Sequence, residues 1–140
     1  MRPLYETQED LENEKSVASI IKSVWDLTAV KMPRAYHLDY ALKDGQDTLR
    51  GFAEIKTRTT NKGKYPTYLI SLSKIMNARR LTEYTGLSCI LIVKWLDNIG
   101  WINLDIEGEL GFGGRKDRND WQDQEPVIFL PIDKFKRLTG

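Results

Sequence analysis

The sequence is poor in cysteine and has no long hydrophobic run. Its single cysteine, Cys89, excludes a disulfide within the chain and belongs to the longest apolar run, Cys89–Val93. A membrane-spanning helix needs about 20 apolar residues, far more than this run offers. The start of the chain, Met1–Asp10, is polar and acidic, unlike a secretory signal. We therefore expect a cytoplasmic protein without a membrane segment, in which Cys89 is a buried, inert thiol.

The chain also lacks an excess of either charge. It has 21 Lys and Arg against 20 Asp and Glu, a net charge of +1, so total charge does not indicate a partner. The distribution is uneven, because no acid occurs between Ile55 and Thr82. The basic residues of that stretch are Lys56, Arg58, Lys62, Lys64, Lys74, Arg79 and Arg80. A local positive face can attract a polyanion, but an ordinary solvated basic helix and loop explains the pattern equally well.

Length and hydrophobic content favour one compact domain over residues 1–140. Hydrophobic residues make up 41% of the chain, enough for a core. A capping-box pattern at Thr7–Asp10 and the helical spacing of apolar residues predict a first helix over Gln8–Trp25. Glu14 lies on the apolar stripe of this helix. We therefore expect it to end the buried face or to have a partner beneath the helix.

Side chains that alternate between two faces predict two strands, Ala35–Lys43 and Leu49–Arg58. The turn Asp44–Asp47 joins these strands into a central hairpin. A basic loop over Thr59–Pro66 and a short strand over Tyr68–Leu72 are expected next, followed by a helix over Ser73–Thr85 that is capped by Ser71 or Ser73 and ended by Gly86. Further strands are expected over Leu87–Leu96, Trp101–Ile106 and Val127–Ile132. A mobile loop is expected over Gly108–Gln124, and a terminal helix capped by Asp133. The pattern indicates an α/β (α+β) fold with a mixed central sheet flanked by helices.

Three charged residues occur among the apolar residues of this hairpin. Asp39 lies on the first strand, and Glu54 and Lys56 lie on the second. Residues two apart in a strand share a face, so the Glu54 carboxylate and the Lys56 ammonium project together. If the hairpin brings Asp39 opposite that pair, two carboxylates and one lysine converge. The alternative is a solvated polar face, but charges are costly in strands that are covered on both sides.

This combination of residue types suits phosphodiester hydrolysis. Two carboxylates at close range can bind Mg²⁺, which prefers hard oxygen ligands and keeps several waters. A bound ion of this kind lowers the pKa of a water and polarises a phosphoryl oxygen. A neighbouring lysine can orient the attacking water and offset negative charge in the transition state. We therefore expect Mg²⁺ as the cofactor, with Mn²⁺ as a substitute.

An acid on one strand followed by Glu-x-Lys on the next resembles the PD-(D/E)XK nuclease superfamily. The residues that carry the resemblance are Leu38-Asp39 and Glu54-Ile55-Lys56, with leucine where the superfamily has proline. The resemblance covers about Leu11 to Val93 and implies a restriction-endonuclease-like αβββαβ core. It also implies that Asp39, Glu54 and the Ile55 carbonyl bind the metal, that Glu14 binds it through water or a second ion, and that Lys56 positions the nucleophile.

The resemblance further implies a small Mg²⁺-dependent endodeoxyribonuclease, a hydrolase of the kind that phages and restriction systems encode, acting in the host cytoplasm if a phage encodes it. DNA is the expected partner. A homodimer would supply the two active sites needed to cut a duplex. Lys74, near the start of the second helix, is the expected phosphate contact, with Arg58, Lys62, Lys64 and Arg79 as further nucleic-acid-binding residues. His37, on the face of Asp39, is a weaker candidate.

Two other classes of function remain open. One is a catalytically inactive nucleic-acid-binding module of the same fold, which would have no reason to bind Mg²⁺ between Asp39 and Glu54. The other is a protein-interaction domain that uses the hairpin bearing Trp95 and Trp101. That domain would show no salt-dependent binding to DNA, whereas phosphate contacts weaken as salt rises.

Overall fold

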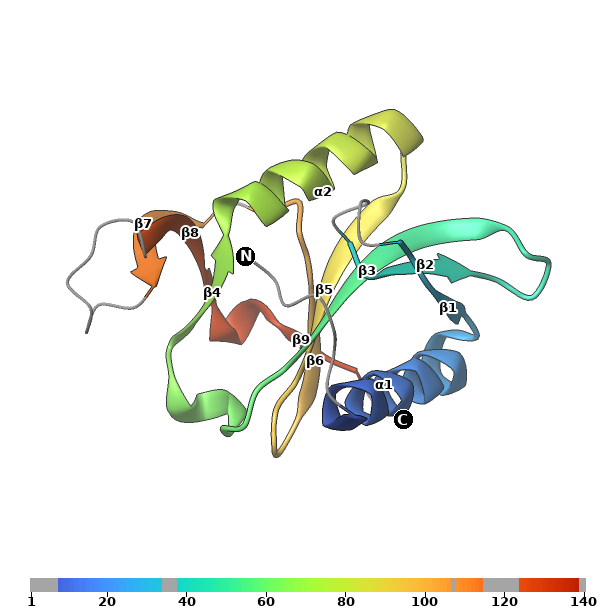
Figure 1. Cartoon of the computed structure of the whole chain (residues 1–140), viewed down its shortest axis with the longest axis horizontal. Coiled ribbons are helices and arrows are strands. Elements are labelled where there is room, and N and C mark those ends of the chain that lie inside the picture. The colour runs from blue at the N-terminus through green and yellow to red at the C-terminus, as the bar shows by residue number, and fades with distance from the viewer. Residues whose placement is uncertain (1–7, 34–37, 107, 115–123, 139–140) are drawn as a thin grey trace.

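The computed structural model describes residues 8–33, 38–106, 108–114 and 124–138. Two sheets and two helices form the described part (Figure 1). The expected fold class is therefore confirmed as a mixed α and β structure. Three sequence expectations concern residues outside these ranges: the Thr7 cap, the role of His37, and the first residues of the strand expected at Ala35.

The larger sheet has six strands in the order β1-β2-β3-β5-β6-β9. Its strands are β1 (Thr28–Lys31), β2 (Tyr40–Lys43), β3 (Leu49–Thr57), β5 (Ser88–Lys94), β6 (Ile99–Asn103) and β9 (Lys136–Arg137). Only the β3–β5 pair is parallel among these described strands, and every other pair is antiparallel. The sheet is thus mixed, as predicted, and the apolar β5 lies inside it.

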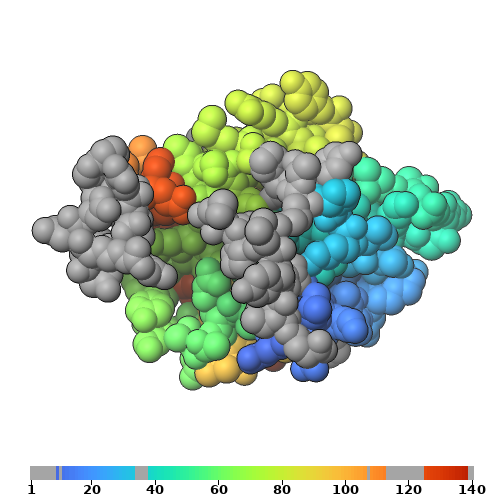
Figure 2. All heavy atoms as spheres, viewed as in Figure 1, coloured from blue at the N-terminus to red at the C-terminus, as the bar shows by residue number. Residues whose placement is uncertain are grey.

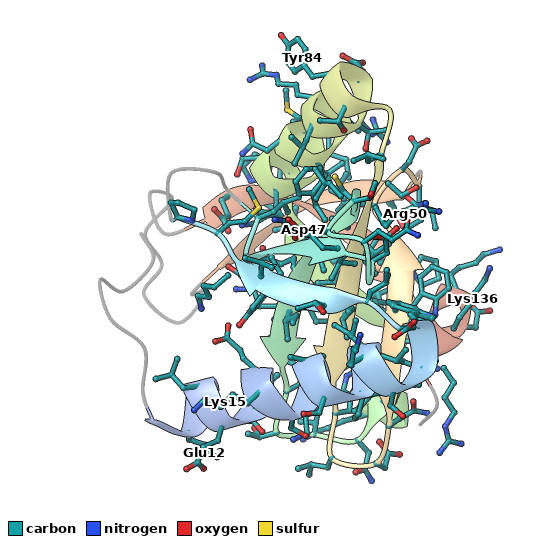
Figure 3. All side chains as sticks on the ribbon, turned by 90° about the vertical axis from the view of Figure 1, so that its right-hand side faces the viewer. Glu12, Lys15, Asp47, Arg50, Tyr84 and Lys136 are labelled. Atoms are coloured by element: carbon teal, nitrogen blue, oxygen red, sulfur yellow. The ribbon has the colours of Figure 1, made fainter. Side chains whose placement is uncertain are left out.

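Helix α1 (Gln8–Trp25), whose bounds match the prediction, covers one face of this sheet. Val17 and Ile21 of α1 are fully buried against a cluster that includes Tyr40, Ala53 and Ile92. In Figure 3 the helix lies across the ends of the strands, with Glu12 pointing away from the sheet. Neither described helix has the length and hydropathy of a membrane-spanning segment.

Helix α2 (Leu72–Thr85) and the smaller sheet cover the opposite face. The Ser71 hydroxyl caps α2 by accepting a hydrogen bond from the Lys74 amide at 3.2 Å. Gly86 ends the helix at a φ of +73°, a left-handed conformation that glycine adopts without steric cost. Both features agree with the sequence. The smaller sheet has the order β4-β8-β7 and consists of β4 (Thr67–Ser71), β8 (Gln124–Pro131) and β7 (Glu109–Gly114).

The structure corrects four predicted elements. The hairpin gains a third strand, β1, on its N-terminal side, and β2 begins only at Tyr40. The strand expected over Tyr68–Leu72 exists as β4 but belongs to the smaller sheet. The loop expected over Gly108–Gln124 contains β7. Instead of a terminal helix capped by Asp133, the chain forms one 3-10 turn, Ile132–Lys134, with Pro131 at its N-cap, followed by β9.

Candidate active site

The register of β2 and β3 determines where the two hairpin carboxylates lie. Tyr40 pairs with Ala53 at the end of an antiparallel ladder, and Asp39 comes directly before this pair as Glu54 comes directly after it. Asp39 occupies the bend before β2, where its carbonyl accepts a hydrogen bond from the Met32 amide at 2.8 Å. The two acids therefore lie at the same end of the β2–β3 ladder, next to the Tyr40–Ala53 pair.

Both carboxylates are buried. Asp39 is 6% exposed and Glu54 is 0% exposed, the two polar residues among the buried residues of the described chain. Most Asp and Glu side chains remain at the protein surface, because burying a charge without compensation costs several kcal/mol. Two buried acids at one end of this ladder are therefore unlike the acids of an ordinary solvated strand.

Two lysines converge on Glu54. The Lys56 and Lys74 ammonium nitrogens lie 3.4 Å and 3.3 Å from its Oε1. Lys56 reaches it because residues two apart on β3 share a face. Lys74 reaches it from the first turn of α2, which the Ser71 cap fixes in place. The site face of the sheet is therefore the α2 face, and both lysines stand beside the buried acid.

Glu14 interacts with different groups. Its carboxylate accepts from the Lys31 ammonium at 3.1 Å and from the Tyr40 hydroxyl. Tyr40 belongs to the cluster that packs on α1, whereas Glu54 faces α2. Within the described ranges, no three Asp, Glu, His or Cys side chains form a group that could hold one metal ion. Glu14 thus has the partner beneath the helix that its place on the apolar stripe predicted.

Tyr40 and Tyr68 are the tyrosines that border the site. Burial chiefly raises the pKa of Tyr40 to about 12, with further contributions from the negative charges of Glu14 and Asp39. Burial also raises the pKa of Tyr68 to about 12, with Arg58 opposing the shift and Glu54 adding to it. In the sequence pattern both tyrosines resemble ordinary core residues of a strand, and only the fold shows that they border the site.

These pKa shifts predict a loss of stability in strong alkali. A tyrosine with a folded pKa near 12 and an unfolded value near 10 keeps its proton longer when folded. Its contribution to the free energy of unfolding is complete below pH 10 and is lost as the pH rises through 12. Ultraviolet titration of tyrosinate should therefore show a late phase near pH 12. Tyr68→Phe should remove part of that phase, and an unchanged late phase would contradict the assignment to Tyr68.

Arg58 continues the site face beyond the end of β3. Its guanidinium lies 4.7 Å from the centroid of the Tyr68 ring and donates a hydrogen bond to the Tyr68 hydroxyl at 2.6 Å. It also donates to the Thr57 carbonyl at 3.0 Å. Arg58 is nevertheless exposed. A fixed, exposed guanidinium is suited to hold a phosphate group.

The other predicted basic contacts are spread over three places. Lys74 lies beside Glu54, while Lys62 and Lys64 belong to the 3-10 turn between β3 and β4. Arg79 lies on α2 and donates to the Ile106 carbonyl at 3.2 Å. The structure therefore places Lys74 beside Glu54 and Arg58 beside Tyr68, whereas Lys62, Lys64 and Arg79 contact other groups: the Trp95 ring, the Tyr65 ring and the Ile106 carbonyl.

The donor set fits a small hard cation. Asp39 and Glu54 offer carboxylate oxygens from opposite strands, and Ile55 contributes a backbone carbonyl between Glu54 and Lys56. Mg²⁺ commonly uses one or two carboxylates and completes its octahedron with water. Two buried acids without a third are therefore sufficient for this ion.

Comparison with known proteins gives one family match and a similar solved structure. The family model described as "Phage putative PDDEXK endonuclease" matches residues 1–138. Among solved structures, the chain is similar to Hjc from Archaeoglobus fulgidus, a Holliday junction resolvase from an archaeal hyperthermophile. That match has a TM-score of 0.50 and 11% identity, and covers 87% of this chain and 95% of Hjc. At this identity the likeness establishes the fold alone. Comparison with curated proteins gives no match.

Proposed function

Because the chain belongs to the phage PDDEXK endonuclease family, we propose that it is a metal-dependent endonuclease that hydrolyses phosphodiester bonds of DNA. The observation that carries the proposal is the pair of buried acids, Asp39 and Glu54, on either side of the Tyr40–Ala53 pair, with the Lys56 ammonium 3.4 Å from Glu54. Burial of two acids is costly for folding, and a bound cation would compensate their charge.

Asp39, Glu54 and the Ile55 carbonyl would hold Mg²⁺, or Mn²⁺ in its place. When bound, the ion would acidify a water and polarise the scissile phosphate. The expected role of Glu14 at the metal is not part of this proposal, because Lys31 and the Tyr40 hydroxyl hold its carboxylate on the α1 side, whereas Glu54 faces α2.

The chain's own side chains would carry the remaining steps. Lys56 would orient the attacking water and place positive charge near the developing charge of the phosphate. Lys74 and Arg58, on either side of this centre, would hold the flanking phosphates of the same strand. Burial of Glu54 by neighbouring side chains would exclude bulk water and strengthen each of these electrostatic interactions.

Cleavage of a labelled DNA panel tests the proposal. The panel contains plasmid, linear duplex, flap, four-way junction and single strand, each incubated with Mg²⁺, Mn²⁺ or a chelator. Metal-dependent cutting of at least one substrate is expected, and end-labelled products would separate internal from terminal cleavage. If no substrate is cut under any metal condition, the enzyme proposal fails. A homodimer, which would cut both strands of a duplex together, is tested by product analysis and solution mass.

DNA binding in chelator should weaken steeply as salt rises. If Arg58, Lys62, Lys64, Lys74 and Arg79 each neutralise one phosphate, the slope of log K against log salt should be about −4 to −5. Replacing Lys64 by alanine should reduce this slope by about one, because one phosphate contact is lost.

Arg50→Ala is the matched control for this measurement. Arg50 is an exposed basic residue near the turn of the β2–β3 hairpin (Figure 3), where its guanidinium lies 3.9 Å from Asp44 Oδ2. It lies outside the proposed contact set, so its removal should leave the slope unchanged. Equal slopes for wild type and Lys64→Ala would refute the assignment of Lys64.

One observation favours a second candidate, an inactive nucleic-acid-binding module of the same fold. Glu54 Oε1 is contacted by two ammonium groups, an arrangement that could serve the structure alone. In that case the protein would bind DNA with the salt dependence described above but would bind no divalent cation at Asp39 and Glu54.

A further inference from the structure

Two loops meet beyond the carboxyl ends of β3 and β5. We call them together the tip: the loop Thr59–Pro66 and the turn Leu96–Asn98. Because β3 and β5 are parallel, with Thr57 opposite Lys94, both loops leave the sheet at the same edge. Figure 1 shows the β3–β4 connection and the β5–β6 turn at the same end of the molecule, and Figure 2 shows them side by side at its surface.

Backbone hydrogen bonds hold the two loops together. The Leu96 amide donates to the Thr60 carbonyl at 3.1 Å, and the Lys62 amide donates to Asp97 Oδ1 at 2.9 Å. At the base of the tip, the Arg58 amide donates to the Lys94 carbonyl at 2.9 Å. The turn itself is closed by the Trp95 amide, which donates to the Asn98 carbonyl at 2.8 Å. The tip is therefore a fixed projection.

The exposed side chains of the tip combine apolar and positive groups. Leu96 is 70% exposed and Tyr65 is 56% exposed. The Lys62 ammonium lies 6.0 Å from the Trp95 ring centroid, and the Lys64 ammonium lies 5.6 Å from that of Tyr65. The one acid of the tip, Asp97, accepts the Lys62 amide. The lysines of the tip give it charge complementarity to a polyanion, and Leu96 gives it an exposed apolar group.

An open polar groove adjoins this leucine. It has a volume of about 590 Å³ and is lined by Thr59, Thr60, Asn61, Gly63, Lys64, Leu96 and Asp97. Hydroxyl, amide and carboxylate groups of this lining can accept or donate hydrogen bonds to a base edge. A nucleotide displaced from its stack beside Leu96 would find partners there.

From this combination we infer that Leu96 inserts between stacked bases of bound DNA and directs the protein to duplexes whose stacking is already interrupted. Apolar wedges of this kind unstack a base step and kink the duplex, at a cost that is smallest where stacking is already broken. Lys62 and Lys64 hold the phosphates on either side. The inference rests on the proposed function and adds a substrate class to it.

The tip lies within reach of the proposed cleavage centre. Four steps along the chain lead from Glu54 in β3 to Arg58 at the base of the tip, roughly 13 Å at the usual rise of a strand. That span corresponds to about two nucleotides of a strand, so a base step opened by Leu96 would lie near the scissile phosphate. Arg58, which bridges the two places, would contact the intervening phosphate.

Fluorescence of 2-aminopurine tests this inference. A continuous duplex and a nicked duplex of the same sequence carry the probe beside the nick position, and binding is measured in chelator so that no cutting occurs. The wild type should increase the fluorescence of the nicked duplex and bind it more tightly than the continuous one. With Leu96→Ala, the fluorescence increase should disappear and the preference for the nicked over the continuous duplex should fall about tenfold, consistent with removal of a buried leucine contact. Leu96→Met should restore both.

Leu110→Ala is the matched control, since Leu110 is also exposed, at 58%, but lies on β7 outside the tip. It should behave as wild type. Binding without a fluorescence increase, or an unchanged preference in Leu96→Ala, would overturn the inference while leaving the nuclease proposal intact. Absence of all DNA binding would overturn both. Concentration-dependent self-association in the absence of DNA that Leu96→Ala abolishes would assign the tip to a second copy and also overturn the inference.

Discussion

Replacing Glu54 by glutamine is expected to lower DNA cleavage by more than about 100-fold while the protein still folds and binds DNA. Glutamine keeps the shape of the side chain but removes the negative charge that the proposed cation would require. Even changes in groups that only support metal ligands alter affinity or activity by about 10- to 100-fold. The measurement is single-turnover cleavage with Mg²⁺ at saturating protein, compared with wild type at the same metal concentration.

This substitution also leaves the ammonium groups of Lys56 and Lys74 without their shared anion. Removing one partner of a buried ion pair commonly costs about 3 to 5 kcal/mol. The melting temperature of Glu54→Gln must therefore be measured beside its activity. Asp39→Asn, which touches neither lysine contact, provides a second variant. Full cleavage by a folded Glu54→Gln or Asp39→Asn protein would contradict the proposed site.

Replacing Lys56 by methionine is expected to reduce cleavage by roughly 100- to 1,000-fold with DNA affinity nearly unchanged. The proposed role of Lys56 is exerted in the transition state, where one positioned positive group typically contributes this factor. Methionine retains most of the side-chain volume, and Lys56 is about one-third exposed, so the fold should tolerate the change.

Lys74→Met provides an informative comparison. Both lysines lie at nearly the same distance from the same oxygen, 3.4 Å and 3.3 Å, so a purely structural role predicts equal effects of the two substitutions. The proposed roles predict a difference: Lys74→Met should weaken DNA binding and reduce the salt slope by about one. Cleavage at saturating DNA should fall less than in Lys56→Met. Indistinguishable profiles would mean that Lys56 only compensates the charge of Glu54.

The central hairpin could be predicted from the sequence because its information is local. Alternating residues identified the two strands, and the turn fixed a register that brings Asp39 and Glu54 to the same end of the hairpin ladder. The two caps of α2 were equally readable, since a serine hydroxyl and a left-handed glycine are local features.

There are physical reasons why strands β1 and β7 were not predicted from the sequence. Strand β1 has four residues, three of them exposed, so it carries no alternation of buried and exposed positions. Strand β7 is rich in glycine, which usually indicates a loop. Here Gly111 is required by packing, because a side chain at that position would overlap the Phe129 ring across the β7–β8 pair.

Long-range contacts at the site could not be predicted from the sequence either. The pairing of Lys74 with Glu54 depends on how α2 packs over the sheet, and the pairing of Glu14 with Lys31 depends on the unpredicted β1. The tip depends on the parallel β3–β5 pair, which joins strands more than 30 residues apart. The types of the catalytic candidates were visible in the sequence, while their partners required the fold.

Binding of Mn²⁺ is the most direct test of the proposed metal centre, because it separates an enzyme from an inactive module of the same fold. Isothermal titration of the wild type should detect a Mn²⁺ site that Mg²⁺ competes for, and both Asp39→Asn and Glu54→Gln should abolish it while remaining folded. Equal Mn²⁺ binding by wild type and both variants, or no binding by wild type with or without uncleavable DNA, would contradict a metal centre at Asp39 and Glu54.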